Sequence, residues 1–127
     1  MSNLIWASKR TLDDLATLCG SNITLNKSAS AYFENAYVVL LGWDPSSLEV
    51  AIKPLTKEDA ISGLIPEDQM HNITVKSSYS RICNKAFMQE ISGVAKLHFE
   101  NEQCYKFKTV WNEKENVLII DLKHREV

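Results

Sequence analysis

The sequence predicts an α+β fold, a single compact domain with an antiparallel sheet of six or seven strands and three or four short helices. Three observations support this prediction. The chain has 127 residues, the length of one domain spanning 1–127. Its composition, 45% hydrophobic and 24% charged, is that of a globular protein. Short stretches with period-2 or helical spacing of apolar residues alternate with turn residues along the chain, which contains only four Gly and three Pro.

The first part of the chain predicts a helix, a strand and a second helix. Thr11 and Asp14 have the spacing of a capping box, and the apolar residues that follow recur every three or four positions. This pattern predicts a helix over 11–19. A short strand over 23–25 and a helix over 28–36 follow it.

The middle of the chain predicts a β-hairpin. Residues 37–43 are aromatic and β-branched, as expected of a strand buried on both faces. The turn sequence Asp-Pro-Ser-Ser at 44–47 precedes a second strand over 48–55, in which inward Leu48, Val50 and Ile52 alternate with outward Glu49, Ala51 and Lys53.

Shorter elements are predicted between this hairpin and the next helix. A capping box predicts a helix over 56–63, and a polar loop follows at 66–69. Period-2 alternation then predicts a strand over 71–76, interrupted by two serines and continued over 79–83.

The last third predicts one helix and a meander. Apolar residues on one face predict a helix over 84–92 that stops at Gly93. Three strands, over 94–99, 104–111 and 116–123, are joined by short polar turns.

The two halves of the chain, 22–55 and 80–123, resemble each other. When Trp43 is set over Trp111, thirteen positions align without a gap, and the Asn-Lys pair at 26–27 matches the pair at 84–85. The second half then contains a ten-residue insertion, about one strand, within 93–108. One interpretation is a degenerate internal duplication packed about a pseudo-twofold axis, with the two tryptophans at equivalent hairpin positions. The other is that any two hairpins with an aromatic residue before the turn align this well.

The order of strand, Asn-Lys, short helix and hairpin resembles the swapped-hairpin fold of AbrB-like transcriptional regulators. The resemblance implies pairing of strands between two similar halves. It rests on element order alone, because Asn26-Lys27 and Asn84-Lys85 stand where those domains usually have a Gly-Arg…Ile-Pro signature, and the chain lacks their strongly basic overall charge.

The cysteines and the start of the chain predict a cytoplasmic protein with no membrane association. Cys19, Cys83 and Cys104 are odd in number and lack CxxC spacing, so three reduced thiols are expected. The first ten residues do not have the charge and hydropathy pattern of a signal peptide, and the longest apolar run is far shorter than a membrane helix.

No catalytic, metal-binding or cofactor-binding motif is recognisable. The four glycines are scattered, which argues against a phosphate-binding loop, and His71, His98 and His124 are isolated. No serine lies in a Gly-x-Ser-x-Gly elbow. We therefore predict no catalytic residue, no metal and no cofactor.

The charge distribution is more informative than the net charge of −2. Residues 44–68 contain six acids and two lysines, a local net charge of −4, whereas residues 71–99 contain four cations and one acid, a local net charge of +3. A basic segment that includes an aromatic residue can contact a nucleic-acid backbone and stack on a base. The candidate binding residues are Lys27, Lys76, Tyr79, Arg81 and Lys85.

The leading functional hypothesis is a non-enzymatic binding or regulatory module that acts through protein–protein contacts, as a homo-oligomer such as a homodimer or with another protein. It depends on the missing catalytic motifs and on the charge asymmetry, which suits an acid–base contact between protomers. A first alternative is a nucleic-acid-binding regulator that uses the basic patch in 71–99. A second is a small enzyme with a pocket between the two halves.

Overall fold

The structure, a computed structural model, describes residues 13–100 and 103–126. These residues form a sheet-rich fold with one antiparallel sheet of nine strands and three α-helices, rather than the predicted six or seven strands. The strand order is β5-β3-β4-β9-β8-β1-β2-β7-β6. The strands are β1 (Leu15–Leu18), β2 (Asn22–Leu25), β3 (Val38–Asp44), β4 (Glu49–Leu55), β5 (Met70–His71), β6 (Thr74–Val75), β7 (Ser80–Cys83), β8 (Tyr105–Asn112) and β9 (Val117–Glu126). The helices are α1 (Lys27–Ser30), α2 (Lys57–Ile61) and α3 (Lys85–Ala95), with 3-10 turns η1 (Ala31–Phe33) and η2 (Glu67–Gln69).

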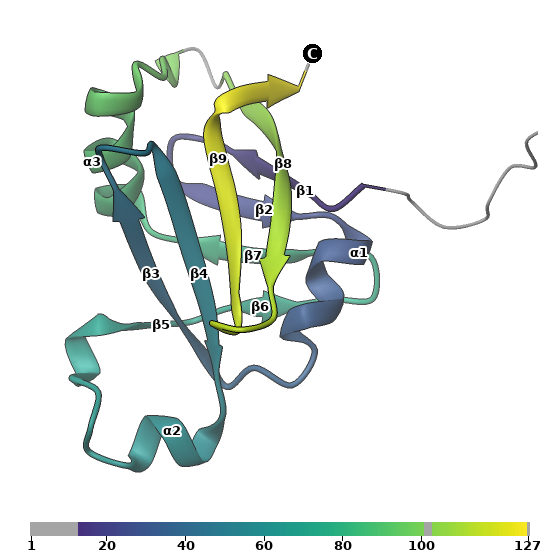
Figure 1. The fold of residues 1–127 in the computed structure, drawn as a ribbon, viewed down its shortest axis with the longest axis vertical. Coiled ribbons are helices and arrows are strands. Elements are labelled where there is room, and N and C mark those ends of the chain that lie inside the picture. The colour runs from purple at the N-terminus through teal and green to yellow at the C-terminus, as the bar shows by residue number, and fades with distance from the viewer. Residues whose placement is uncertain (1–12, 101–102, 127) are drawn as a thin grey trace, which may run out of the picture.

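The sheet folds over on itself to form two layers. In Figure 1 the long strands β3, β4, β9 and β8 run upright, and β1, β2, β7 and β6 cross behind them. Pairing of β1 with β8 joins the layers on one side. On the other side the segment 70–75 pairs with β3 through β5 and with β7 through β6. The two ends of the strand order are therefore separated by two residues of chain only.

The hydrophobic core fills the space between the two layers. Alternate residues of the strands point inward and are buried, among them Val50 and Ile52 on β4 and Leu118 and Ile120 on β9. The crossing layer contributes Leu18, Ile23, Leu25 and Ile82. Phe33 and Phe107 are the largest of the fully buried side chains. This alternation leaves a complete second set of strand residues facing outward.

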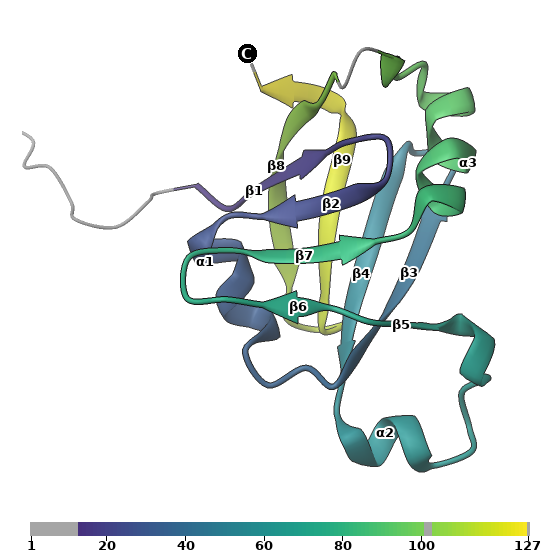
Figure 2. The same cartoon turned by 180° about the vertical axis from the view of Figure 1, so that it is seen from behind.

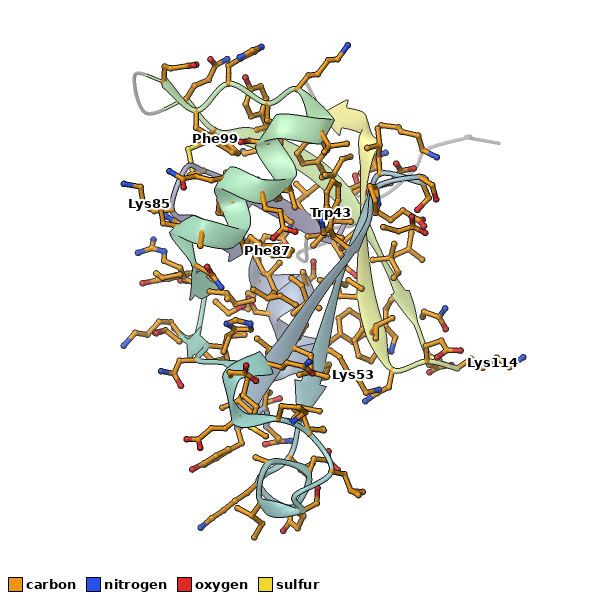
Figure 3. All side chains as sticks on the ribbon, turned by 90° about the vertical axis from the view of Figure 1, so that its left-hand side faces the viewer. Trp43, Lys53, Lys85, Phe87, Phe99 and Lys114 are labelled. Atoms are coloured by element: carbon orange, nitrogen blue, oxygen red, sulfur yellow. A yellow bond between two sulfur atoms is a disulfide. The ribbon has the colours of Figure 1, made fainter. Side chains whose placement is uncertain are left out.

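The two long hairpins share one geometry. Trp43 lies opposite Val50 in the β3–β4 hairpin, and Trp111 lies opposite Leu118 in the β8–β9 hairpin. The last residue of each turn, Leu48 and Asn116, has a positive φ of 55° and 58°. Trp111 stacks on Tyr32 with ring centroids 4.4 Å apart. Figure 3 shows Trp43 and Phe87 between α3 and β3.

Asparagine caps the helix that follows β2 and the helix that follows β7. The side chain of Asn26 accepts a hydrogen bond from the backbone amide of Ala29 at 3.1 Å, and Asn84 accepts one from Phe87 at 3.0 Å. Because β2 and β7 are antiparallel, α1 and α3 begin at opposite ends of this strand pair, as Figure 2 shows.

The helix predicted over 11–19 is wrong, because the described part of this segment, from residue 13, contains strand β1. Residues 11 and 12 lie outside the described residues. Ala16 and Leu18 are buried while Leu15 and Thr17 are not, which is period-2 burial. Leu15, Leu18 and Cys19 also fit a helical spacing, and pairing with β2 and β8 decides between the two.

The strand predicted over 94–99 is also wrong. Helix α3 continues through Gly93 and ends at Ala95. The residue that caps it, Lys96, has a left-handed backbone conformation, and an irregular segment follows. The extra length of the second half is therefore helix and irregular chain rather than a strand. Predictions for 23–25, for the 37–55 hairpin, for the capped helix α2 and for β8 and β9 are confirmed within one to three residues at each end. The 71–76 strand is divided into β5 and β6, and the 28–36 helix ends as η1 at Phe33.

The expectation of three reduced cysteines is wrong as well. Cys19 and Cys104 form a disulfide, and Cys83 is free and exposed. Cys19 follows β1 and Cys104 precedes β8, so the bridge extends the β1–β8 pairing by one more pair. The partners are 85 residues apart in sequence, and only this long-range pairing places them together.

Candidate binding face

The outward side of the crossing layer, together with the part of β8 that pairs with β1, contains a row of cationic and hydroxyl side chains. Arg81 on β7 lies opposite Thr24 on one side and Thr74 on the other. Thr24 lies opposite Thr17, and Thr17 lies opposite Lys106. Their chain neighbours are mostly buried, so all five face outward together. With strands about 4.8 Å apart, Arg81 and Lys106 are about 14 Å apart at the backbone.

The guanidinium of Arg81 is oriented by two contacts. Its Nε donates to Thr24 Oγ1 at 3.4 Å, and its Cζ lies 5.3 Å from the centre of the Tyr79 ring. A cation over an aromatic face at an exposed site stabilises this arrangement by about 0.5–1 kcal/mol.

The tight turn between β6 and β7 adds two more of the predicted residues. The backbone amide of Lys76 donates to the carbonyl of Tyr79 at 2.8 Å, so these residues lie opposite each other. Val75 and Ser80 face the core side, so Lys76 and Tyr79 face outward. We call the surface formed by Lys76, Tyr79, Arg81 and Lys106, with Thr17, Thr24 and Thr74, the basic face.

Two of the five predicted residues lie away from this face. Lys27 is the first residue of α1 and Lys85 the first residue of α3, at opposite ends of the β2–β7 pair. Figure 3 shows Lys85 pointing away from the body of the molecule. The structure therefore brings together Lys76, Tyr79 and Arg81, and places Lys27 and Lys85 at the two sides.

Sequence reasoning missed Lys106 because its place depends on the long-range pairing of β8 with β1. A local signal was present. In the stretch Tyr105–Thr109 the buried residues alternate with Lys106 and Lys108, which places both lysines on the outward face.

The five adjacent strands β8, β1, β2, β7 and β6 contain three cations and no acidic residue. The cations are Arg81, Lys106 and Lys108. In contrast, β3, β4 and β9 contain the acids Asp44, Glu49, Asp121 and Glu126, and Glu126 is the residue of β9 that lies opposite Lys106. The acids of the strands thus lie on the β3–β4–β9 side of the sheet, next to a run of strands without acids.

A pocket of about 690 Å³ lies beside the basic face, between the β1–β2 turn, α3 and the segment before β8. Lys85 and Gln89 line it from α3, and Phe99 lines it from the opposite wall together with the Cys19–Cys104 disulfide. Figure 3 shows Phe99 close to this disulfide. The pocket combines one aromatic ring, one cation, the carboxylate of Glu100, and amide and hydroxyl groups, and its lining residues include no nucleophile beside a base.

The groups with shifted pKa lie elsewhere. Partial burial, and then the carboxylate of Asp14, raise the pKa of Tyr32. Hydrogen bonds from Ser46 lower the pKa of Asp44. Among the described residues no three His, Cys, Asp or Glu side chains are grouped as metal ligands. No helix in that part of the chain has the length and apolar character needed to cross a membrane.

No protein-family model matches the chain, and neither the curated proteins nor the solved structures provide a match.

Proposed function

We propose that this protein is a non-enzymatic binding module that acts through protein–protein contacts, with the basic face as its contact surface and an acidic protein surface as its partner. The observation that supports this proposal is the run of five adjacent strands without an acidic residue. Like charges repel a basic partner there, and an acidic partner meets no carboxylate within those strands, although Glu126 of the next strand lies opposite Lys106 at the edge of the run.

The construction of the face suits recognition of carboxylates. Its side chains project from paired strands, so little backbone freedom is lost on binding. Arg81 presents a planar fork of donors, and the hydroxyl of Thr74 on one side can donate to the same acceptor. On the other side the Thr24 hydroxyl orients the fork, because it accepts from Arg81 Nε and donates its own proton to Asn22 Oδ1. Such a contact is steered by charge and weakens as salt screens it.

The test measures binding to two polyanions of equal charge, polyglutamate and oligothymidylate, at low and high salt. We expect the wild type to bind polyglutamate and Arg81→Glu/Lys106→Glu to bind it at least about tenfold more weakly, because each reversal replaces attraction by repulsion. Lys114→Glu is the matched control, since it changes the charge at the tip of the β8–β9 turn, away from the face (Figure 3). Equal binding by wild type and double variant would overturn the proposal.

The second candidate function is nucleic-acid binding, which the pairing of Tyr79 with Arg81 favours. An aromatic side chain on a basic strand face can stack on a base, for about 1–3 kcal/mol by alanine substitution. Under this reading oligothymidylate binds more tightly than polyglutamate, and Tyr79→Ala weakens only the oligothymidylate complex. The protein-contact proposal expects the opposite order of affinities.

We further propose that the chain is a degenerate tandem of two units. When Trp43 is aligned with Trp111, Ala51 is aligned with Ile119. These two corresponding residues pair with each other in the sheet. Asn22 pairs with Cys83, and Leu25 pairs with Ser80. When Asn26 is aligned with Asn84, each of these two pairs is converted into the other. Both correspondences support a pseudo-twofold relation between the units.

The first strands of the two units support the same relation. β1 pairs with β8 of the second unit, and β5 pairs with β3 of the first. Under the tryptophan alignment Phe107 corresponds to Val39, and these residues pair with Ala16 and His71 respectively. The units then extend over 13–55 and 70–126, somewhat longer than the predicted halves.

The cytoplasmic location remains a prediction. The Cys19–Cys104 disulfide argues against this prediction, because the cytosol keeps such cysteine pairs reduced whereas oxidising compartments preserve the bond.

A further inference from the structure

The connection between the two units is an exposed acidic arm. We define the arm as residues 56–69, which include α2 and η2 and extend beyond the sheet in Figures 1 and 2. It contains the acids Glu58, Asp59, Glu67 and Asp68 and a single cation, Lys57. Of these acids, Asp59 belongs to the capping box of α2 with Thr56.

The arm also exposes two large apolar side chains between its acidic pairs. Ile61 is 71% exposed and Leu64 is 87% exposed. Single exposed apolar residues are normal on protein surfaces, but here two of them lie three residues apart with acids on both sides. The arm therefore presents a small apolar centre with an acidic surround.

A surface with the complementary pattern lies on β8, where the basic face continues. The outward residues of β8 are Lys106, Lys108 and then Val110, which is 68% exposed. Val110 lies opposite Ile119 on β9, and both line a hollow of about 510 Å³. The hollow is also lined by the acids Glu49, Glu113 and Asp121, so acids of an incoming segment are favoured only toward Lys106 and Arg81.

We propose, resting on the proposed function, that the partner of the basic face is a second copy of this chain, whose arm docks on it. Ile61 and Leu64 of the arm cover Val110, and the arm carboxylates face Lys106 and Arg81. Each copy has one arm and one face, so two copies can make this contact twice in a symmetric dimer. Two linked contacts in one dimer raise the effective concentration of each for the other.

The experiment is sedimentation velocity on the full chain over a range of concentrations, at low salt and at about 0.5 M salt, where surface charges are largely screened. We expect concentration-dependent dimers that high salt weakens. Arg81→Glu/Lys106→Glu on the face and Glu67→Lys/Asp68→Lys on the arm should each weaken dimerisation at least about tenfold. Ile61→Ser/Leu64→Ser should do so at both salt concentrations, since it removes the apolar part. Lys114→Glu should dimerise as the wild type does.

Mixing the two charge-reversed variants makes the test specific. Each alone is expected to be monomeric, and the mixture should form a one-to-one heterodimer, because the reversed arm now matches the reversed face. A monomeric wild type, or a dimer that the arm variants leave unchanged, would overturn this inference. Retained polyglutamate binding by a monomeric wild type would leave the proposed function standing, whereas loss of both would remove both. Oligothymidylate binding by a wild-type monomer would instead favour the nucleic-acid function.

Discussion

Asp44, at the end of β3, shows how one hydroxyl group can set the pKa of a surface carboxylate. Its Oδ1 accepts hydrogen bonds from Ser46 Oγ at 2.7 Å and from the Ser46 amide at 2.9 Å. The hydroxyl bond is the largest cause of the lowered pKa, followed by the amide bond, and partial desolvation opposes both. A carboxyl with a lowered folded-state pKa stabilises the fold above its unfolded pKa, and this stabilisation is lost as the pH falls through the folded-state value.

We predict that Ser46→Ala raises the pKa of Asp44 toward its ordinary value of 3.8 without fully restoring it, because the amide bond remains. An NMR titration of the Asp44 side chain measures this directly. Ser92→Ala is the control, since that hydroxyl donates to the Gln89 carbonyl inside α3. An unchanged Asp44 pKa in Ser46→Ala would mean that the hydroxyl bond does not determine it.

The positions of the basic-face residues were predictable from the sequence to different extents. Lys76, Tyr79 and Arg81 are close in sequence on one tight hairpin, so local reasoning grouped them correctly. Lys27 and Lys85 were grouped with them on charge alone, and the antiparallel arrangement of β2 and β7 separates them. Lys106 belongs to the face because β8 pairs with β1, where its partner Thr17 is 89 residues earlier in the chain, and the local alternation gives its outward orientation but not this pairing.

At the scale of elements, burial and pairing decide where local patterns are ambiguous. The β1 segment fits a helical and a strand spacing equally well, and it becomes a strand because β2 and β8 supply hydrogen-bond partners on both sides. Gly93 predicts the end of a helix, yet α3 continues past it, because one exposed glycine inside a helix costs only about 1 kcal/mol. Capped and strongly alternating elements such as α2 and β4 were predictable because their signals are local.

The disulfide between the start of β8 and the end of β1 leads to a prediction about stability. A bridge between residues 85 apart closes a long loop and restricts the unfolded chain, so its reduction should lower the free energy of unfolding by about 3–4 kcal/mol. Urea titrations with and without dithiothreitol measure the difference, in a Cys83→Ala background that excludes exchange with the free thiol.

Cys19→Ser/Cys104→Ser in the same background is the matched control and should unfold at the lower stability whether or not reductant is present. Identical urea midpoints for the oxidised and reduced protein would contradict the expected stabilisation.

At the scale of the whole molecule, the arrangement separates a closed two-layer body from one projecting segment. Strand pairing between the first and second halves of the chain joins both sides of the body, through β1 with β8 and β5 with β3. This closure involves partners far apart in sequence, which is why the count of strands and their order were not predictable from the chain. The arm takes no part in these pairings and connects the end of β4 to the start of β5.

If the arm only links two similar units, the covalent connection should be movable. We predict that a circular permutant that starts at Leu64, ends at Gly63 and joins the original termini through a short Gly/Ser linker folds and unfolds cooperatively. The join is short enough, because residues 15 and 126 lie on opposite sides of β8, opposite Lys108 and Lys106, and are therefore about 12 Å apart. Circular dichroism melting and the near-ultraviolet tryptophan signal compare the permutant with the wild type.

A second permutant, opened between Glu113 and Lys114 in the β8–β9 turn, is the matched control, because it interrupts a hairpin inside one unit. We expect it to be markedly less stable than the arm-opened form. The paired strands β8 and β9 lose their short connection, so a larger loss of chain entropy is needed to bring them together. Equal stability of the two permutants, or an arm-opened form without a cooperative transition, would count against two units joined by a linker. The opposite order of stabilities would show that the arm is an integral part of the fold, and its availability for a second copy would then have to be rejected as well.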